Sequence, residues 1–241
     1  LQKIFSKRKI NIITNAMVDK IEKDDMVQVY LDNGDVIEAE KALIAVGVKG
    51  NIENIGLKDC NVDIDDGWIT VNEFMQTSKE GVYAIGDVVG PPWLAHVASA
   101  EGVIAAEHLS GNNPNPMEYS NIPGCTYCHP EVASVGLNEK EALDAGYDIK
   151  VGNFPFRGLG KAVASGESEG FVKIIYDAKY GELLGCHIIG ANATDLISEI
   201  SLARDLETTY NEILNSIHPH PTLSEAIMEA TADALDEAIH I

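Results

Sequence analysis

The chain has 241 residues, of which 45% are hydrophobic and 23% are charged, and this balance is ordinary for a globular protein. It excludes a disordered, collagen-like or coiled-coil protein, and at about 150 residues per domain it predicts one or two domains. The formal net charge of −21 disfavours nucleic acid and membrane surfaces as partners, because both are anionic. The longest apolar runs, such as 42–46, fall far below the ~20 residues that a membrane-spanning helix needs.

The first residues and the cysteines indicate in which cellular compartment the protein is expected. The chain begins Leu1-Gln2-Lys3, without Met or an apolar signal core, so we expect no export signal and a piece of a longer chain. Four cysteines are too few for a disulfide scaffold of this size. We therefore expect a reducing compartment, which is the cytoplasm, or the mitochondrial matrix if the source is eukaryotic.

The first 90 residues show the pattern of short strands. The residues Asp32-Asn33-Gly34-Asp35 are typical of a hairpin turn, because Asn-Gly tolerates positive φ angles. The run 42–46 is apolar throughout, as in a strand buried on both faces, and it ends at Gly47. Strands are expected at 10–14, 26–31, 36–40, 42–46, 67–71 and 82–85.

A helix is expected over 94–109, after the break at Pro91-Pro92. The stretch 110–116 is the clearest linker, so we place a boundary near residue 118. A strand-then-helix order beyond the boundary indicates a mixed α+β unit. Its strands are expected at 125–135, 171–176 and 183–189, and its helices at 138–145, 194–206 and 223–238.

The segment Cys125-Thr126-Tyr127-Cys128-His129 matches both a dithiol redox pair and a c-type haem attachment site. Haem attachment occurs in exported proteins, and a redox pair sits at a helix start that lowers the thiol pKa. Here the chain continues as an extended segment, in which residues i and i+3 point to opposite faces. A zinc site would need a second pair, but Cys60 and Cys186 stand alone in the sequence. We interpret the cysteines as structural and predict no metal site.

The segment 77–87 ends in Gly86-Asp87 shortly before the predicted helix at 94–109. A glycine lets a ligand come close to the backbone, an aspartate accepts hydrogen bonds from hydroxyl groups, and a helix N-terminus favours negative charge. This arrangement indicates a ligand with a hydroxylated chain and phosphates. A plain turn would explain the Gly-Asp dipeptide alone.

The segment His218-Pro219-His220-Pro221-Thr222 is extended by its prolines and precedes a predicted helix. Thr222 and Glu225 have the spacing of a capping box, with Thr at the N-cap and Glu at N3. Alternatively, Glu225 orients His220 and sets its pKa, which would make His220 a general base. Both interpretations use the same carboxylate, and the sequence leaves both open.

Taken together, these segments resemble the C-terminal half of the dihydrolipoamide dehydrogenases, a branch of the class I pyridine nucleotide-disulfide oxidoreductase family. The segment 77–87 is similar to the second flavin-binding motif of that family. The ending Thr222-Leu223-Ser224-Glu225 and the lack of a C-terminal cysteine pair favour the lipoamide branch over glutathione and mercuric reductases. Further similar segments are 90–96, 127–136, 166–174 and 184–190.

The resemblance implies an α/β and α+β fold in three parts. Residues 1–48 would be the end of an NAD-binding domain, 49–118 a central FAD-binding segment, and 119–241 an α+β dimerisation domain. The implied cofactors are FAD and NAD. The implied partners are a second copy in a homodimer and the lipoyl domain of a 2-oxo acid dehydrogenase or glycine cleavage complex.

The resemblance also implies roles for single residues. His220 would take a proton from dihydrolipoamide in the active site of the other subunit, with Glu225 orienting it. Asp87, with Gly86, would bind the ribityl chain of FAD, and Gly47 would lie near NAD. The residues expected near the pyrimidine end of the flavin are Trp93, Leu94, Ala95 and His96.

The sequence departs from the family pattern in two ways. The loop 47–51 lacks the Arg and Pro of the usual Gly-Arg-x-Pro-Asn, and no GxGxxG or Cys-x4-Cys occurs anywhere. We therefore expect a fragment, inactive by itself, of a flavin-dependent enzyme that oxidises protein-bound dihydrolipoamide with NAD⁺. The alternatives are another disulfide reductase of the family, or a non-catalytic dimerisation or ligand-binding module.

Overall fold

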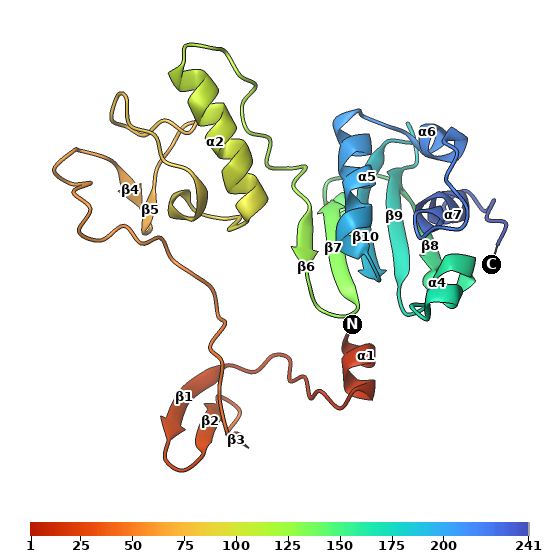
Figure 1. Ribbon diagram of the computed structural model, residues 1–241, viewed down its shortest axis with the longest axis horizontal. Helices are drawn as coiled ribbons and strands as arrows, with labels where there is room; N and C mark the ends of the chain where they lie inside the picture. Colours follow the sequence, from red (N-terminus) through yellow and green to blue (C-terminus); the bar gives the residue numbers. More distant parts are fainter. Residues whose placement is uncertain (241) are drawn as a thin grey trace. The chain divides into compact units, whose positions relative to one another are not determined.

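The computed structural model describes residues 1–240, which form two compact units, 1–117 and 118–240 (Figure 1). The finer division of the first unit into residues 1–48 and 49–118 stays a prediction.

The first unit consists of short elements joined by long loops. Gly34, at φ +90°, and the hydrogen bond from Leu31 N–H to the Asp35 carbonyl (2.9 Å) form the expected turn between β2 and β3. The sheet is antiparallel in the order β1-β2-β3, and β4 pairs with β5 in a separate hairpin. The elements are α1 (Gln2–Lys7), β1 (Val18–Lys23), β2 (Val27–Leu31), β3 (Val36–Ala39), β4 (Ile64–Asp65), β5 (Trp68–Ile69), the 3₁₀ helix η1 (Gly86–Val89) and α2 (Ala95–Leu109).

Two strands expected in this unit are wrong. Residues 10–14 and 42–46 form no strand, and the side chains of Leu43 and Val46 are about nine-tenths exposed (91% and 89%). An all-apolar strand is stable only between neighbouring strands and beneath covering helices, and no described strand pairs with 42–46. The expected strand at 82–85 is a single bridge from Tyr83 to Gln76, and 67–71 shortens to β5.

The second unit is a five-stranded antiparallel sheet in the order β6-β7-β10-β9-β8, with helices after and between its strands. The strand expected at 125–135 is divided at His129-Pro130, where proline removes a ladder donor. The sequence pattern missed β8. The strands are β6 (Gly124–Thr126), β7 (Glu131–Gly136), β8 (Ile149–Pro155), β9 (Phe171–Asp177) and β10 (Leu183–Gly190); the helices are α3 (Glu139–Asp144), η2 (Phe156–Gly158), α4 (Gly160–Ser165), α5 (Ala193–Asp205), α6 (Tyr210–Asn215) and α7 (Glu225–Asp233).

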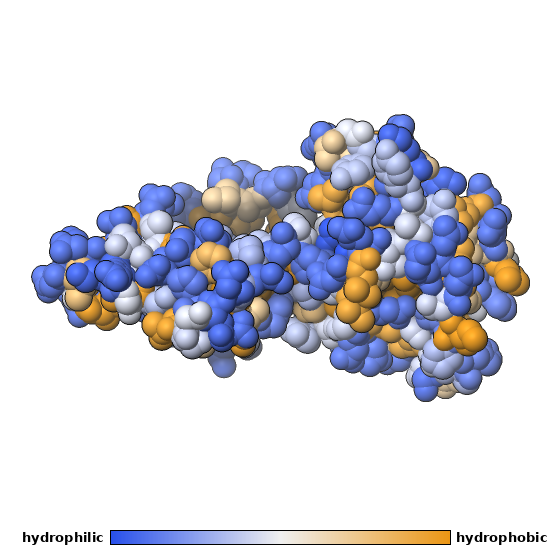
Figure 2. Space-filling view, turned by 90° about the horizontal axis from the view of Figure 1, so that it is seen from above, coloured by the Kyte–Doolittle hydropathy of each residue, from blue (hydrophilic) through white to orange (hydrophobic). Residues whose placement is uncertain are grey.

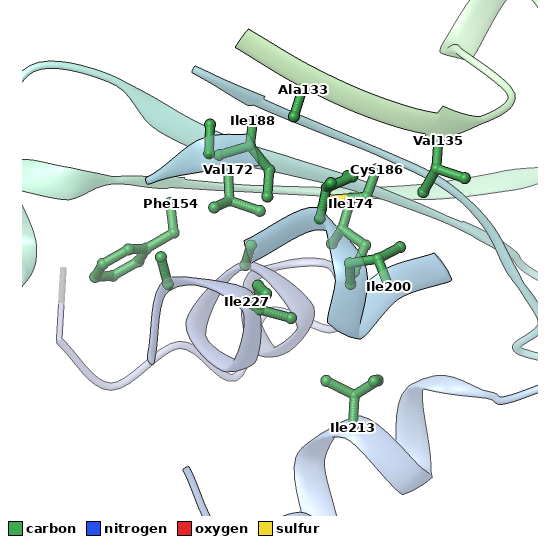
Figure 3. Packing of buried hydrophobic residues seen from close by; sticks show 14 of the residues in the cluster. Ala133, Val135, Phe154, Val172, Ile174, Cys186, Ile188, Ile200, Ile213 and Ile227 are labelled. Carbon is green, nitrogen blue, oxygen red and sulfur yellow. The ribbon is translucent and has the colours of Figure 1, made fainter. Parts of the chain in front are cut away.

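One face of this sheet carries the core, because the strand register aligns apolar side chains in rows across it. In one row Ile188 pairs with Ala133 on one side and Val172 on the other, and Val172 pairs with Phe154. These side chains point at helices α5, α6 and α7, which contribute Ile200, Ile213 and Ile227 (Figure 3). Complete burial of each such isoleucine contributes roughly 2 kcal/mol to stability.

The opposite face has a smaller apolar contact. Ile175 follows Ile174 on β9 and therefore points away from the main core, where it packs with Leu184 and with Ala142 of α3. Lys173 forms an ion pair with Glu139 on this same side of the strand. The sheet is thus covered by helices mainly on one face.

Helix α7 is seated on the edge strand β8 by a glycine and a carboxylate. A Cβ atom added to Gly152 would lie 1.7 Å from the Ala230 carbonyl oxygen, so only glycine allows the helix backbone to come so close. The next residue, Asn153, donates its backbone N–H to Asp233 Oδ2 (2.7 Å) at the end of the helix. These two contacts determine where α7, and with it Glu225, lies on the sheet.

Apolar side chains also reach the surface in several separate places (Figure 2). The most exposed of them is Ile217, at 98%, in the loop before α7. No helix among residues 1–240 is long and apolar enough to cross a membrane.

We predict that Gly152→Ala lowers the free energy of unfolding by about 3 kcal/mol, because the new methyl group overlaps the backbone of α7. Gly160→Ala is the control, since no described atom lies within 4 Å of its added Cβ and alanine favours the helix that begins there. Urea unfolding followed by far-ultraviolet circular dichroism measures both. Equal midpoints for the two variants would contradict the proposed seating of α7.

Candidate functional site

The second unit places His220 in direct contact with Glu225. His220 lies in the extended segment between α6 and α7, and Glu225 is the first residue of α7. His220 Nδ1 is 2.8 Å from Glu225 Oε1, and the two side chains are 75% and 16% exposed. The imidazole therefore has one nitrogen turned to an anchored carboxylate, while most of the ring faces the surface.

Glu225 engages a different donor with each carboxylate oxygen. Its Oε2 accepts a hydrogen bond from the Thr222 backbone N–H at 2.8 Å, which is the carboxylate half of a capping box. The other half is absent among the described contacts: the Thr222 hydroxyl donates to the Pro219 carbonyl (2.7 Å) and lies 2.9 Å from the Ser224 hydroxyl. The expected N-cap at Thr222 is wrong: α7 begins after Ser224, which makes no side-chain cap. Capping and orientation of His220 are compatible, since the two oxygens serve them separately.

Burial, hydrogen bonds and nearby histidines act on the pKa of Glu225. Burial raises this pKa, but the hydrogen bonds from the Thr222 N–H and from His220 outweigh burial, so the pKa lies below its ordinary value. Glu225 is consequently ionised at neutral pH and can only accept hydrogen bonds. His220 must then donate from Nδ1, and a neutral ring presents the lone pair of Nε2 to an incoming group. This is the geometry of a general base.

The first unit holds the second group of expected site residues. Gly86 begins η1 at φ +73° and donates its N–H to Glu101 Oε2 (2.7 Å), a carboxylate that is 2% exposed on α2. Asp87 follows with an exposed side chain. Gly86 is thus locked to α2, while the neighbouring carboxylate lies at the surface.

The segment before α2 is extended, and the ring of Trp93 in it lies at a tilted angle against a second tryptophan. Leu94 is the N-cap residue of α2 and makes no side-chain cap. The ring centroids of Trp93 and Trp68 lie 5.4 Å apart, so Trp93 rests against β5. Ala95 and His96 form the first turn of α2 and are exposed. The start of α2 can therefore offer backbone N–H groups and a favourable dipole to an anion.

Gly47 lies in the loop between β3 and β4. It is exposed at φ +119°, in a stretch without regular structure. The structure therefore brings together Gly86, Asp87 and the start of α2 in the first unit, and His220 and Glu225 in the second. The roles assigned to all of these residues stay predictions.

Two further pairs were missed by sequence reasoning. Glu101 binds Gly86 N–H, and His218, two residues before His220, lies 2.8 Å from Glu199. His218 is visible in the proline-rich segment, but its partner is 19 residues earlier on another helix. Nothing in the sequence spacing relates these two side chains.

The cysteine pair lies in the sheet and the turn that follows it. Cys125 is on β6, packs against the main core and has its pKa raised by burial, with Glu131 and Asp195 adding to the effect. Cys128 Sγ lies 3.1 Å from the Pro130 carbonyl oxygen and can donate to it. The raised pKa disfavours the thiolate that redox chemistry needs. Within residues 1–240, no group of three or more His, Cys, Asp or Glu side chains could hold a metal ion.

Comparison with protein families covers most of the chain. Residues 1–102 match the pyridine nucleotide-disulphide oxidoreductase profile. Residues 122–231 match the pyridine nucleotide-disulphide oxidoreductase dimerisation domain, which includes both His220 and Glu225.

Curated relatives and solved structures agree with these matches. The dihydrolipoyl dehydrogenase of Bacillus subtilis is 47% identical over 100% of this chain, and that of Zymomonas mobilis is 46% identical over 99% of it. The chain spans about half the length of these relatives, 52% of each. LpdA from Mycobacterium tuberculosis is 28% identical, with a TM-score of 0.87 over 95% of this chain and 50% of that one. The flavoprotein disulfide reductase RclA of Escherichia coli, at 22% identity, shares the fold with a TM-score of 0.89 over 96% of this chain and 54% of that one.

These findings confirm the predicted fold class, in which segments of cofactor-binding domains precede an α+β dimerisation domain. They also confirm the resemblance to the C-terminal half of dihydrolipoamide dehydrogenases. The chain belongs to the pyridine nucleotide-disulphide oxidoreductase family.

Proposed function

We propose that this chain is the C-terminal half of a dihydrolipoamide dehydrogenase, an enzyme that oxidises protein-bound dihydrolipoamide with NAD⁺ by way of FAD and a redox-active disulfide. The observation that carries the proposal is the His220–Glu225 pair, with its 2.8 Å contact and exposed imidazole, in the dimerisation domain. The relatives at 46–47% identity are dihydrolipoyl dehydrogenases, which supports the choice of substrate.

His220 performs the proton transfer in this proposal. Its Nε2 accepts the proton of one dihydrolipoamide thiol, and the resulting thiolate attacks the enzyme disulfide, so that one S–S bond forms as another breaks. Glu225 stabilises the imidazolium that results, because its carboxylate faces Nδ1–H. When bound, FAD would serve as the electron carrier between the reduced disulfide and NAD⁺.

The residues at the start of α2 fit FAD. Asp87 offers an exposed carboxylate to the hydroxyls of the ribityl chain, next to a glycine whose added Cβ would lie 3.2 Å from Ala98. Trp93, Leu94, Ala95 and His96 would lie near the pyrimidine end, where the helix dipole favours a negative flavin. Gly47 would lie near NAD. The disulfide and the GxGxxG motifs are absent from these 241 residues, so they would come from the remainder of a longer protein.

The proposed partners follow from the same assignment. The match to a dimerisation domain supports a homodimer, in which His220 of one subunit serves the active site of the other. The lipoyl domain of a 2-oxo acid dehydrogenase or glycine cleavage complex would present the substrate.

The proposed function is tested with the full-length protein. We expect rapid NAD⁺ reduction with dihydrolipoamide and little NADPH oxidation with glutathione disulfide. The reverse preference would assign the chain to another disulfide reductase. Inactivity with both, in a protein that holds FAD, would favour a non-catalytic module.

For the 241-residue chain by itself we predict negligible dihydrolipoamide-dependent NAD⁺ reduction and a colourless preparation, because the redox disulfide and the GxGxxG motifs are missing. Absorbance at flavin wavelengths and a standard turnover assay measure both properties. A yellow protein with tightly held FAD would show that the first unit binds the flavin without the rest of its domain.

We also predict that residues 119–241 form a twofold dimer. Interfaces that build an active site in this way bury on the order of 2,000 Å² or more and are largely apolar. Sedimentation velocity at micromolar concentration should therefore give a species of twice the chain mass. A monomer would count against the assignment of His220 to the active site of a partner subunit.

Substitutions at the pair should separate catalysis from helix capping in the full-length enzyme. We expect His220→Gln to lower turnover by roughly 100-fold or more. Glu225→Gln should lower turnover by less, because the imidazole remains and loses only the charged partner that orients it. Since the pKa of Glu225 is lowered in the folded state, its stabilising effect should be present above pH ~4.5 and fade as the pH falls through the folded pKa.

Glu212→Gln is the matched control, because Glu212 accepts the Thr209 N–H (2.9 Å) in a complete capping box at the start of α6. Both variants should show similar small changes in melting temperature, and only Glu225→Gln should lower turnover. Wild-type turnover in Glu225→Gln would reduce this residue to a helix cap. Full activity in His220→Gln would remove the catalytic assignment.

A further inference from the structure

His218 is the buried counterpart of His220. The two histidines are separated by one proline, yet the side chain of His218 is 5% exposed whereas that of His220 is 75% exposed. His218 Nε2 lies 2.8 Å from Glu199 Oε1 on helix α5. The segment that carries the proposed base is therefore tied to a second helix besides α7.

Both ring nitrogens of His218 face acceptors. Besides the Glu199 carboxylate at Nε2, the backbone carbonyl of Ser216 lies 3.1 Å from Nδ1. A neutral imidazole has a single N–H and would direct a lone pair at one of these oxygens. Only the doubly protonated ring donates to both, so the geometry indicates a buried imidazolium paired with Glu199.

We propose that the His218–Glu199 pair is a positioning device for the base His220: it clamps the 216–222 segment to α5 and so determines where the His220 imidazole is presented. This inference rests on the proposed function. Neither residue touches the reacting atoms, and both act through the backbone on either side of Pro219.

The composition of the segment explains why a side-chain clamp is needed. Pro219 and Pro221 flank His220 and have no N–H, so these two residues cannot donate a backbone hydrogen bond to a neighbouring element. Apolar burial does not hold the start of the segment either, since Ile217 is 98% exposed. Downstream of His220 the Thr222 hydroxyl and N–H are both bonded; upstream, His218 supplies the corresponding anchor.

The charges around His218 are consistent with this role. The hydrogen bond that His218 donates to the Glu199 carboxylate raises the pKa of His218. Burial opposes the rise, and the Ser216 carbonyl and the more distant Glu225 add to it. Glu212 on the adjacent helix α6 is turned to Thr209 instead. Because the folded-state pKa is raised, the contribution of the clamp is present at pH ~6.5, the ordinary histidine pKa, and is lost as the pH rises through the folded-state pKa.

The test uses Glu199→Gln, in which the amide oxygen can still accept from His218 Nε2–H but the negative charge is gone. Glu207→Gln is the control, because Glu207 lines the same groove between α5 and α6 and its substitution removes an equal charge. In the full-length enzyme we expect Glu199→Gln to lower kcat by about tenfold in the pH range where the wild type keeps the second proton on His218 and the variant has lost it. The fall in kcat on the alkaline side should move to lower pH, and Glu199→Asp should restore it in part.

A second measurement follows the ring itself. Histidine nitrogen and carbon NMR shifts of the 241-residue chain should show His218 doubly protonated at pH 7 in the wild type and in Glu207→Gln, and titrating at lower pH in Glu199→Gln. A wild-type His218 that is neutral at pH 7 would overturn the clamp. A shifted His218 titration with an unchanged pH profile of kcat would overturn its positioning role.

The proposed function and the clamp fail differently. If the flavin-loaded wild type does not oxidise dihydrolipoamide, the proposed function is wrong, and with it the positioning role. If the wild type is active and Glu199→Gln loses the same activity at every pH, the pair is structural only and the proposed function stands.

Discussion

The proposed site of the second unit depends on the two hydrogen bonds that the Glu225 carboxylate accepts. One oxygen accepts from the Thr222 N–H at the start of α7, and the other faces His220 Nδ1, each at 2.8 Å. A single ionised group therefore links the helix start, the loop and the imidazole. Because the side chain is only 16% exposed, these contacts are little screened by water, and both keep the carboxylate charged.

That carboxylate is held in place by packing far from it in the sequence. Helix α7 lies close to β8 because Gly152 has no side chain, and Asn153 donates to Asp233 at the far end of the helix. The apolar rows of the sheet bury Ile227 of α7 and Ile200 of α5 in one core. Since α5 also carries Glu199, the two helices that contact the His218–His220 segment are located by the same core.

The first unit combines a buried hydrogen bond with apolar side chains that stay exposed. Its buried Glu101 locks Gly86 to α2, which gives local order around Asp87. Elsewhere, however, apolar residues such as Leu43 and Val46 stay exposed. A parallel-sheet strand acquires its stability from neighbours on both sides, and the chain spans only about half of its curated relatives. The described strands of this unit pair only with their neighbours along the chain.

The sequence by itself indicated the family, the order of most elements and the β2–β3 turn, because the motifs and the turn depend on residues close together in the chain. It offered the His220–Glu225 contact as one of two interpretations. Only the tertiary structure decided that 42–46 is not a strand, that Glu225 contacts both Thr222 and His220, and that His218 is buried against Glu199. Strand formation at 42–46 requires distant partners. Glu199 and His218 meet only because the core packs α5 beside the loop, and no spacing rule encodes that contact.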